Sequence, residues 1–321
     1  MTTESFRLFM SRIIDYAGLY PPANLSLEDA FRNFVEFQDS PDSWMLSRFV
    51  IPAKRLPHLS PLMPDSVNEL SFTALGRSGA SADEFLSNLE LDIADIQAFR
   101  ETHSSRVLVD MFETALPASA LNDTIHNLVK TSSDLLNKTG LTVFFEAPFD
   151  AAQDKPFGEG WQSRVDSLVR ALRKLKNRRV GFKLRTGGVI ANMFPSAEQI
   201  ARAIVSVRDA GVPIKCTAGL HHPIRHFNES VQTKMHGFLN VFGAGILAAA
   251  KNLSQAAIQS ILEDEDPENF TFDSDGFAWK GLRAAASEIA KARLFAVSFG
   301  SCSFDEPRED LRELFRGRDA L

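Results

Sequence analysis

The chain alternates short apolar runs with longer stretches in which apolar residues recur at helical spacing. This pattern predicts eight strands, at residues 12–19, 48–53, 69–75, 106–112, 141–147, 180–185, 212–217 and 237–243. Each run is apolar enough to be covered on both faces, as in a parallel sheet enclosed by helices. Eight strands that alternate with helices predict an α/β fold, the (β/α)8 TIM barrel. A doubly wound open sheet is the alternative, disfavoured because no G-x-G-x-x-G and no Walker loop is present.

Helices are expected between these strands, several with a serine at or near the start, where its side chain can cap the first turn. They are predicted at residues 26–38, 81–102, 119–137, 160–177, 196–210 and 245–263. The second unit contains Pro57, Pro61 and Pro64, so its helix should be short or broken. We expect one barrel domain, residues 1–321, with residues 264–321 as an appended segment. In that segment, a loop or hairpin is expected at 270–278 and helices at 281–294 and 307–316.

Composition narrows the possible partners. With 321 residues, 44% of them hydrophobic, the chain can bury a large core, and its net charge of −6 gives no electrostatic reason to bind nucleic acid or an anionic membrane. The two cysteines, Cys216 and Cys302, cannot form a disulfide framework. The N-terminus lacks a basic stretch followed by an apolar one, and no run of 18 apolar residues occurs. We therefore expect a soluble, cytoplasmic protein with a small-molecule substrate. A homo-oligomer is left open.

Polar residues interrupt five neighbouring strands, and side-chain alternation assigns them to the inside of the barrel. On the sixth strand Lys183 and Arg185 share one face, while Phe182 and Leu184 face the helices. The full inner set is Asp110, Glu146, Lys183, Arg185, Lys215, Thr217 and Asn240. Burying charge costs several kcal/mol per ion, so a purely structural role for this cluster is the less favoured interpretation. In this fold the carboxyl ends of the strands carry the active site.

Two lysines inside one barrel suggest amine chemistry. A desolvated lysine beside a second cation has a lowered pKa, and its neutral amine can attack a carbonyl to form a Schiff base. Here Lys183 would be the nucleophile and Lys215 the group that lowers its pKa. Glu146 or Asp110 would shuttle protons, and Arg185 would bind an anionic group of the substrate.

The same residues carry a resemblance to a known family. Lys183 followed by Thr186 and Gly187, with Lys215 followed by Thr217-Ala218-Gly219, resembles the two lysine strands of class I aldolases of the deoxyribose-phosphate aldolase type. The resemblance implies a Schiff base at Lys183, modulation by Lys215 and proton relay by Asp110. Residues 215–223 and 298–307 also resemble segments of a group of bacterial (β/α)-barrel proteins, a resemblance that implies no activity.

The histidines support a second hypothesis. His221 and His222 follow the seventh strand, and either one could join Glu146 and Asp110 around a divalent metal in a lyase or hydrolase. A neutral histidine such as His221 could equally act as a general acid or base without a metal. The leading hypothesis needs no cofactor. A third hypothesis is a non-catalytic barrel that binds a small anion.

Three other features bear on substrate binding. Asp15 ends the first strand and could bind a cation or the substrate, or could brace the turn. The turns that contain Gly187, Gly188 and Gly243 could hold a phosphate or carboxylate on free backbone N–H groups, or could reflect close packing. Residues 298–303 lack the G-x-S-x-G elbow, and the sequence identifies no partner histidine for them, so a structural turn is expected there.

Overall fold

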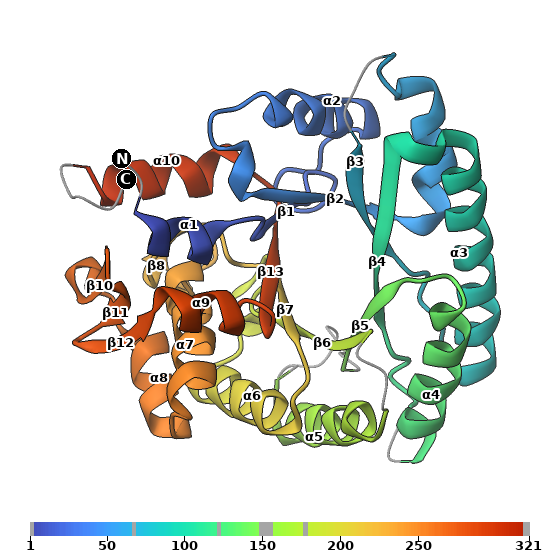
Figure 1. Ribbon diagram of the computed structural model, residues 1–321. Helices are drawn as coiled ribbons and strands as arrows, with labels where there is room; N and C mark the ends of the chain where they lie inside the picture. Colours follow the sequence, from blue (N-terminus) through green and yellow to red (C-terminus); the bar gives the residue numbers. More distant parts are fainter. Residues whose placement is uncertain (1–2, 66–68, 121–122, 148–156, 176–178, 317–321) are drawn as a thin grey trace.

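The computed structural model describes residues 3–65, 69–120, 123–147, 157–175 and 179–316. Within these residues, eight parallel strands close into a barrel in the order β1-β13-β7-β6-β5-β4-β3-β2 (Figure 1). The barrel strands are β1 (Ile14–Tyr16), β2 (Leu46–Pro52), β3 (Leu70–Leu75), β4 (Val107–Ala115), β5 (Thr142–Glu146), β6 (Val180–Arg185), β7 (Ile214–Thr217) and β13 (Ala296–Ser301). The predicted TIM-barrel fold is confirmed.

Helices follow the strands and cover the outside of the barrel (Figure 1). Ser26, Ser81 and Ser196 each cap a helix by accepting a hydrogen bond from a backbone N–H of the first turn, as expected. The second unit has only the 3₁₀ helix η2 (Ala53–Leu62), because two prolines interrupt it. The α-helices of these units are α2 (Leu27–Gln38), α3 (Ala82–His103), α4 (Asp123–Asn137), α5 (Glu159–Lys174) and α6 (Ala197–Ala210). Short 3₁₀ turns are η1 (Ser43–Met45), η3 (Ser104–Arg106) and η4 (Ala191–Met193).

The predicted eighth strand at residues 237–243 is wrong. These residues begin helix α7 (Phe238–Lys251), which is buried along most of its length. A short apolar run is compatible with both a buried strand and a buried helix, and no polar face marks this helix. The barrel is closed instead by β13, which pairs with β1 and β7. Part of the 264–321 segment therefore belongs to the barrel wall.

The chain between β7 and β13 forms an extended insertion. It contains a hairpin of β8 (His226–Asn228) and β9 (Thr233–Met235), helices α7 and α8 (Gln255–Glu263), the 3₁₀ turn η5 (Pro267–Asn269), an antiparallel sheet of β10 (Phe270–Asp273), β11 (Gly276–Trp279) and β12 (Leu282–Ala285), and helix α9 (Ala286–Ala292). The hairpin expected at 270–278 is confirmed, and β12 adds a third strand to it. Helix α10 (Asp305–Leu314) follows β13.

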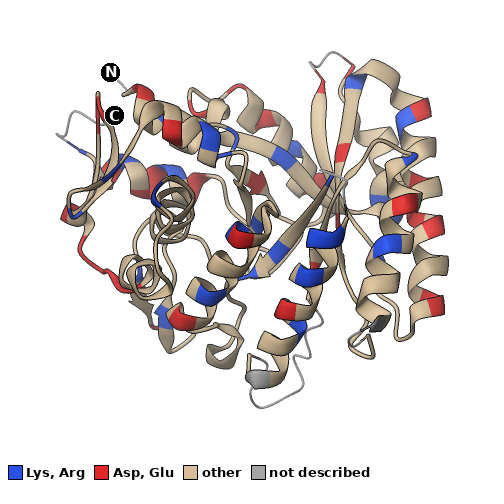
Figure 2. Cartoon of the chain, turned by 60° about the horizontal axis from the view of Figure 1, so that its bottom comes forward, with Lys and Arg blue, Asp and Glu red and all other residues tan. Residues whose placement is uncertain are grey.

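Helix α1 (Glu4–Met10) packs against this three-stranded sheet. The Phe6 and Phe9 rings lie 5.1 and 5.2 Å from that of Phe272, and the Phe6 ring lies 5.7 Å from that of Phe315 beyond α10. These contacts explain why the two ends of the described chain lie side by side (Figure 1). The outer helices carry both signs of charge (Figure 2). Across the described residues, no helix is both long and apolar enough to cross a membrane.

Candidate functional site

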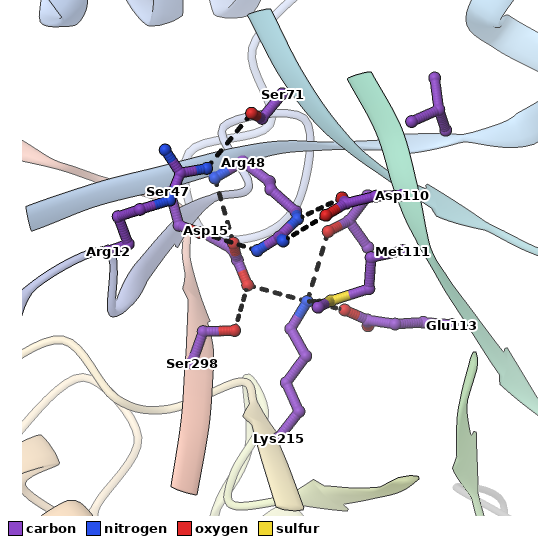
Figure 3. A network of polar contacts seen from close by, with 12 residues as sticks. Arg12, Asp15, Ser47, Arg48, Ser71, Asp110, Met111, Glu113, Lys215 and Ser298 are labelled. Atoms are coloured by element: carbon purple, nitrogen blue, oxygen red, sulfur yellow. Dashed lines mark hydrogen bonds and ion pairs between the residues drawn. The ribbon is translucent and has the colours of Figure 1, made fainter. Parts of the chain in front are cut away.

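A network of paired charges crosses the barrel interior and is centred on Lys215 (Figure 3). Its ammonium nitrogen lies 2.8 Å from Asp15 Oδ2 and forms a second ion pair with Glu113. Asp15 also accepts hydrogen bonds from the Ser298 hydroxyl at 2.7 Å and from the Arg48 backbone N–H at 3.1 Å. The side chains of Asp15 and Lys215 are 0% and 2% exposed. Asp15 is therefore a buried partner of Lys215 and not a group open to solvent.

A second part of the network surrounds Lys183 on the neighbouring strand. Lys183 Nζ lies 2.9 Å from Glu113 Oε2 and 3.4 Å from Glu146 Oε2. Arg185 Nε donates to the other oxygen of Glu146 at 2.8 Å. Acids and bases thus alternate from Asp15 to Arg185, and each buried charge has an opposite neighbour. This pairing offsets the cost of removing these ions from water.

Asp110 lies in the same network but is not paired with the lysines. The register between β3 and β4 shifts at this position, because Asp110 is an extra residue between Val109 and Met111. The shift brings Asp110 and Met111 into the same network (Figure 3), with Met111 Sδ 3.2 Å from Lys215 Nζ. Asp110 instead forms two hydrogen bonds of 2.7 Å with Arg48. In a regular strand Asp110 and Met111 would lie on opposite faces, and the bulge is the reason that both enter the network.

Glu113 is the central carboxylate, and our sequence reasoning missed it. We expected the fourth strand to end at residue 112, whereas β4 continues to Ala115. In the last part of β4, Met111 and Glu113 alternate with Phe112, which belongs to the core outside the barrel. Alternation alone would not have identified Glu113, because it lies three residues after Asp110 and only the bulge at Asp110 brings both residues inside the barrel.

The pKa shifts follow from the pairing. Burial opposes ionisation of Glu113, but Lys215 and Lys183 outweigh it and lower the pKa of this carboxyl to about 2. Burial likewise opposes the charge on Lys183, yet Glu113 and Glu146 raise its pKa above the ordinary value. The expectation that Lys215 lowers the pKa of Lys183 is therefore wrong, because Glu113 stands between the two ammonium groups. In the resting site, Lys183 is an ammonium ion.

A cavity of about 290 Å³ opens at the carboxyl ends of the strands, above this network. Its polar lining includes Glu113, Lys183, Arg185 and Thr217, and its apolar lining includes the loop after β1. The hydroxyl of Tyr20, in that loop, is buried and has no hydrogen-bond partner among the described residues. The remaining lining residues are Ala17, Pro21, Pro22, Val50, Leu75, Gly188, Val189, Met193, Ala218, Gly219, His221, Gly300 and Cys302.

The adjacent histidines face different surroundings. His221 lines the cavity, and its Nδ1 lies 3.0 Å from Glu306 Oε2. Burial opposes its charge, but Cys302 and Glu306 outweigh burial and raise the pKa of His221 to about 9. His222 lies 2.5 Å from Asp310 Oδ2 and lines a separate surface groove. The cavity therefore has one cationic imidazole at its rim.

Two of the remaining candidates lie in helix α7, away from strand ends. Asn240 accepts a hydrogen bond from the Arg225 backbone N–H and donates to two backbone carbonyls, each at 2.8 Å. Gly243 packs on Phe277 so closely that an added Cβ would lie 2.7 Å from its ring. Gly187 also lies close to the Gly219 turn, since an added Cβ would lie 2.9 Å from Gly219 Cα. Among the glycines expected to bind an anion, Gly188 lines the cavity.

The structure does not assemble the proposed metal ligands. Asp110 is bound to Arg48, Glu146 to Lys183 and Arg185, and His221 to Glu306. Within the described part of the chain, no group of three or more histidine, cysteine, aspartate or glutamate side chains is arranged to hold a metal ion.

Comparisons with known proteins bear on the fold. No protein-family model matches the chain, and no curated protein matches its sequence. Among solved structures, deoxyribose phosphate aldolase from Aeropyrum pernix, described as a unique tetramer, matches with a TM-score of 0.50 and 12% identity over 97% of this chain and 93% of that one. A family 5 xyloglucanase from Paenibacillus pabuli matches with a TM-score of 0.22 and 9% identity over 89% of this chain and 98% of that one. The aldolase match supports the barrel fold.

Proposed function

We propose that the protein is an aldolase-type lyase that forms a Schiff base between Lys183 and a small carbonyl compound. The observation that carries this proposal is the position of Lys183, a cavity-lining amine within reach of two carboxylates, Glu113 and Glu146. A barrel fold like that of an aldolase is consistent with this chemistry.

The resting ammonium group must first lose a proton. We assign Glu146 as its acceptor, because Glu113 is held by both lysines whereas Glu146 shares its charge with Arg185. An anionic substrate group bound by Arg185 would compete with Glu146 for that guanidinium and leave the carboxylate more basic. The neutral amine then adds to the carbonyl carbon, and the proton held by Glu146 leaves with the hydroxyl group as water. As the carbon–carbon bond breaks, its electrons pass to the iminium and Glu146 takes the hydroxyl proton from the departing carbonyl fragment.

Lys215 has a different role in this proposal. Its side chain is only 2% exposed and lies between Asp15 and Glu113. Lys215 keeps Glu113 ionised, and Glu113 in turn positions the ammonium group of Lys183. A Schiff base is therefore expected at Lys183 and not at Lys215.

The cavity defines a substrate class. Arg185 and the imidazolium of His221 provide positive charge at its wall, which favours a carboxylate or phosphate group on the substrate. Val50, Leu75 and Met193 add apolar surface. A short carbonyl compound with one anionic end fits these features.

Reductive trapping tests the proposal. The protein is incubated with short aldehydes, 2-oxo acids and phosphorylated carbonyl compounds, reduced with borohydride, digested and analysed by mass spectrometry. The expected result is an adduct on Lys183 in excess of any adduct on Lys130, whose side chain is 59% exposed and which reports non-specific labelling. Lys183→Arg keeps a cation between the carboxylates and should abolish the adduct.

Two outcomes would contradict the proposal. Equal labelling of Lys183 and Lys130 across the panel would show that Lys183 is not a specific nucleophile. Tight binding of an anionic carbonyl compound without trapping or turnover would favour the anion-binding barrel.

A further inference from the structure

Cys302 follows directly after β13 and lines the cavity, with a side chain that is 8% exposed overall. Its sulfur lies 3.8 Å from His221 Nδ1, a residue 81 positions away in the sequence. The pairing exists because β13 is inserted beside β7, so the chain that leaves each strand reaches the same side of the cavity. The segment that appeared in the sequence to lack a partner histidine therefore has one.

Glu306 completes this cluster. It lies in the first turn of α10, four residues beyond Cys302, and its Oε2 is 3.0 Å from the same Nδ1 of His221. The carboxylate stabilises the protonated ring, so the Nδ1 proton lies between one carboxylate and one sulfur. An imidazolium next to a cysteine favours the thiolate, which is the reactive form of the side chain.

We propose that Cys302 is a nucleophilic thiol that reacts with electrophilic carbon compounds small enough to enter the cavity, with the imidazolium of His221 stabilising its thiolate. The thiol releases its proton to solvent, and the thiolate sulfur attacks carbon. With iodoacetamide as the probe, the sulfur–carbon bond forms, the carbon–iodine bond breaks and iodide leaves, while His221 remains protonated throughout. No oxidant or reductant is needed.

This site is separate from the Lys183 chemistry. The reaction uses neither Lys183 nor its carboxylates, so the failure of Schiff-base trapping would leave it standing, and the reverse also holds. The two reactive groups line one cavity, however, so alkylation of Cys302 should also obstruct access to Lys183.

Cys216 is an internal control within the same chain. Its side chain is 2% exposed and packs outside the barrel against residues of α6 and α7. Burial raises the pKa of this thiol to about 12. The chain contains only these two cysteines, so every alkylation event can be assigned to one of them.

The experiment measures the alkylation rate of each cysteine in the folded, full-length protein at neutral pH by mass spectrometry, with glutathione as a free-thiol reference. We expect Cys302 to react faster than glutathione despite its burial, and Cys216 to remain unlabelled on the same timescale. His221→Asn should slow Cys302 by about tenfold or more, because the cation that stabilises the thiolate is lost. Glu306→Gln, at a position with a 40% exposed side chain, should also slow it.

His126→Gln on α4 is the matched histidine control and should leave the Cys302 rate unchanged. A Cys302 rate at or below that of glutathione would overturn the proposal. So would an unchanged rate in folded His221→Asn and Glu306→Gln proteins, whose folding is checked by circular dichroism.

Discussion

Lys183 and Lys215 stand opposite each other on β6 and β7, and their ammonium groups share one carboxylate, that of Glu113. Without Glu113, two buried cations would face each other across neighbouring strands. With it, both ammonium groups have an ion-pair partner, and that of Lys183 is held at the cavity. The charge state of the site therefore depends on a glutamate supplied by β4.

Glu113 should make the fold sensitive to acid. Its pKa is about 2 in the folded protein against an ordinary value of 4.5, so its stabilising contribution is present above about pH 4.5 and is lost as the pH falls towards 2. Glu113→Gln should destabilise the protein at pH 7 by about 3–5 kcal/mol, since two buried lysines lose a partner. The same variant should also lose less of its free energy of unfolding than wild type as the pH falls from about 4.5 towards 2. Urea unfolding at several pH values, followed by tryptophan fluorescence, measures both effects.

Glu101→Gln, on an exposed position of α3, is the control for this change and should retain the wild-type pH dependence. If Glu113→Gln and wild type lost stability in parallel between pH 4.5 and 3, Glu113 would not be the ionised partner of the two lysines.

The strands that carry the two lysines could be predicted from the sequence because they are regular. Residues 180–185 form β6 with the predicted limits, and Lys183 aligns with Lys215 without a bulge. Strict alternation of apolar and polar residues is sufficient to assign faces in such strands. The same rule failed for β4, where the extra residue at Asp110 changes the alternation and the strand is longer than its apolar run.

Two other features depend on tertiary structure. The apolar run at 237–243 has no local property that separates a strand from a fully buried helix, and only the closure of the barrel by β13 decides the question. The contact between Cys302 and His221 arises from that closure, because it places β13 beside β7. Neither relationship is encoded in the spacing of residues along the chain.

Asn240 is predicted to stabilise the fold. It is 0% exposed, and its amide satisfies the backbone N–H of Arg225, just before β8, and two backbone carbonyls, of Ile261 and Asp264, near the end of α8. Asn240→Leu should lower the free energy of unfolding by several kcal/mol, at about 1–3 kcal/mol for each buried group left without a partner. Thermal and urea unfolding measure the loss. A variant with wild-type stability but weaker binding of anionic carbonyl compounds would instead support a substrate contact.

Two glycines of α7 should respond oppositely to alanine. In Gly243→Ala the new methyl group would lie 2.7 Å from the buried ring of Phe277, whereas in Gly245→Ala the nearest atom is 3.5 Å away. Replacing a helical glycine by alanine raises the free energy of unfolding by up to about 1 kcal/mol, but overpacking a core lowers it by about 1–3 kcal/mol. We expect Gly243→Ala to destabilise the protein and Gly245→Ala to stabilise it slightly. Equal unfolding free energies for both variants would show that Phe277 moves aside without cost.

His221 should titrate well above an ordinary histidine. Its pKa is raised from 6.5 to about 9, because Cys302 and Glu306 outweigh the effect of burial. Two other histidines, His222 and His226, also lie near the Glu306 carboxylate. The resulting stabilisation is complete below about pH 6.5 and is lost as the pH rises through about 9. In NMR spectra of histidine-labelled protein, one resonance, absent from His221→Asn, should titrate near pH 9. Glu306→Gln should move this titration towards 6.5 and reduce the loss of stability between these pH values. A His221 resonance that titrates near 6.5 in both proteins would show that the imidazole is not held as a cation at the cavity.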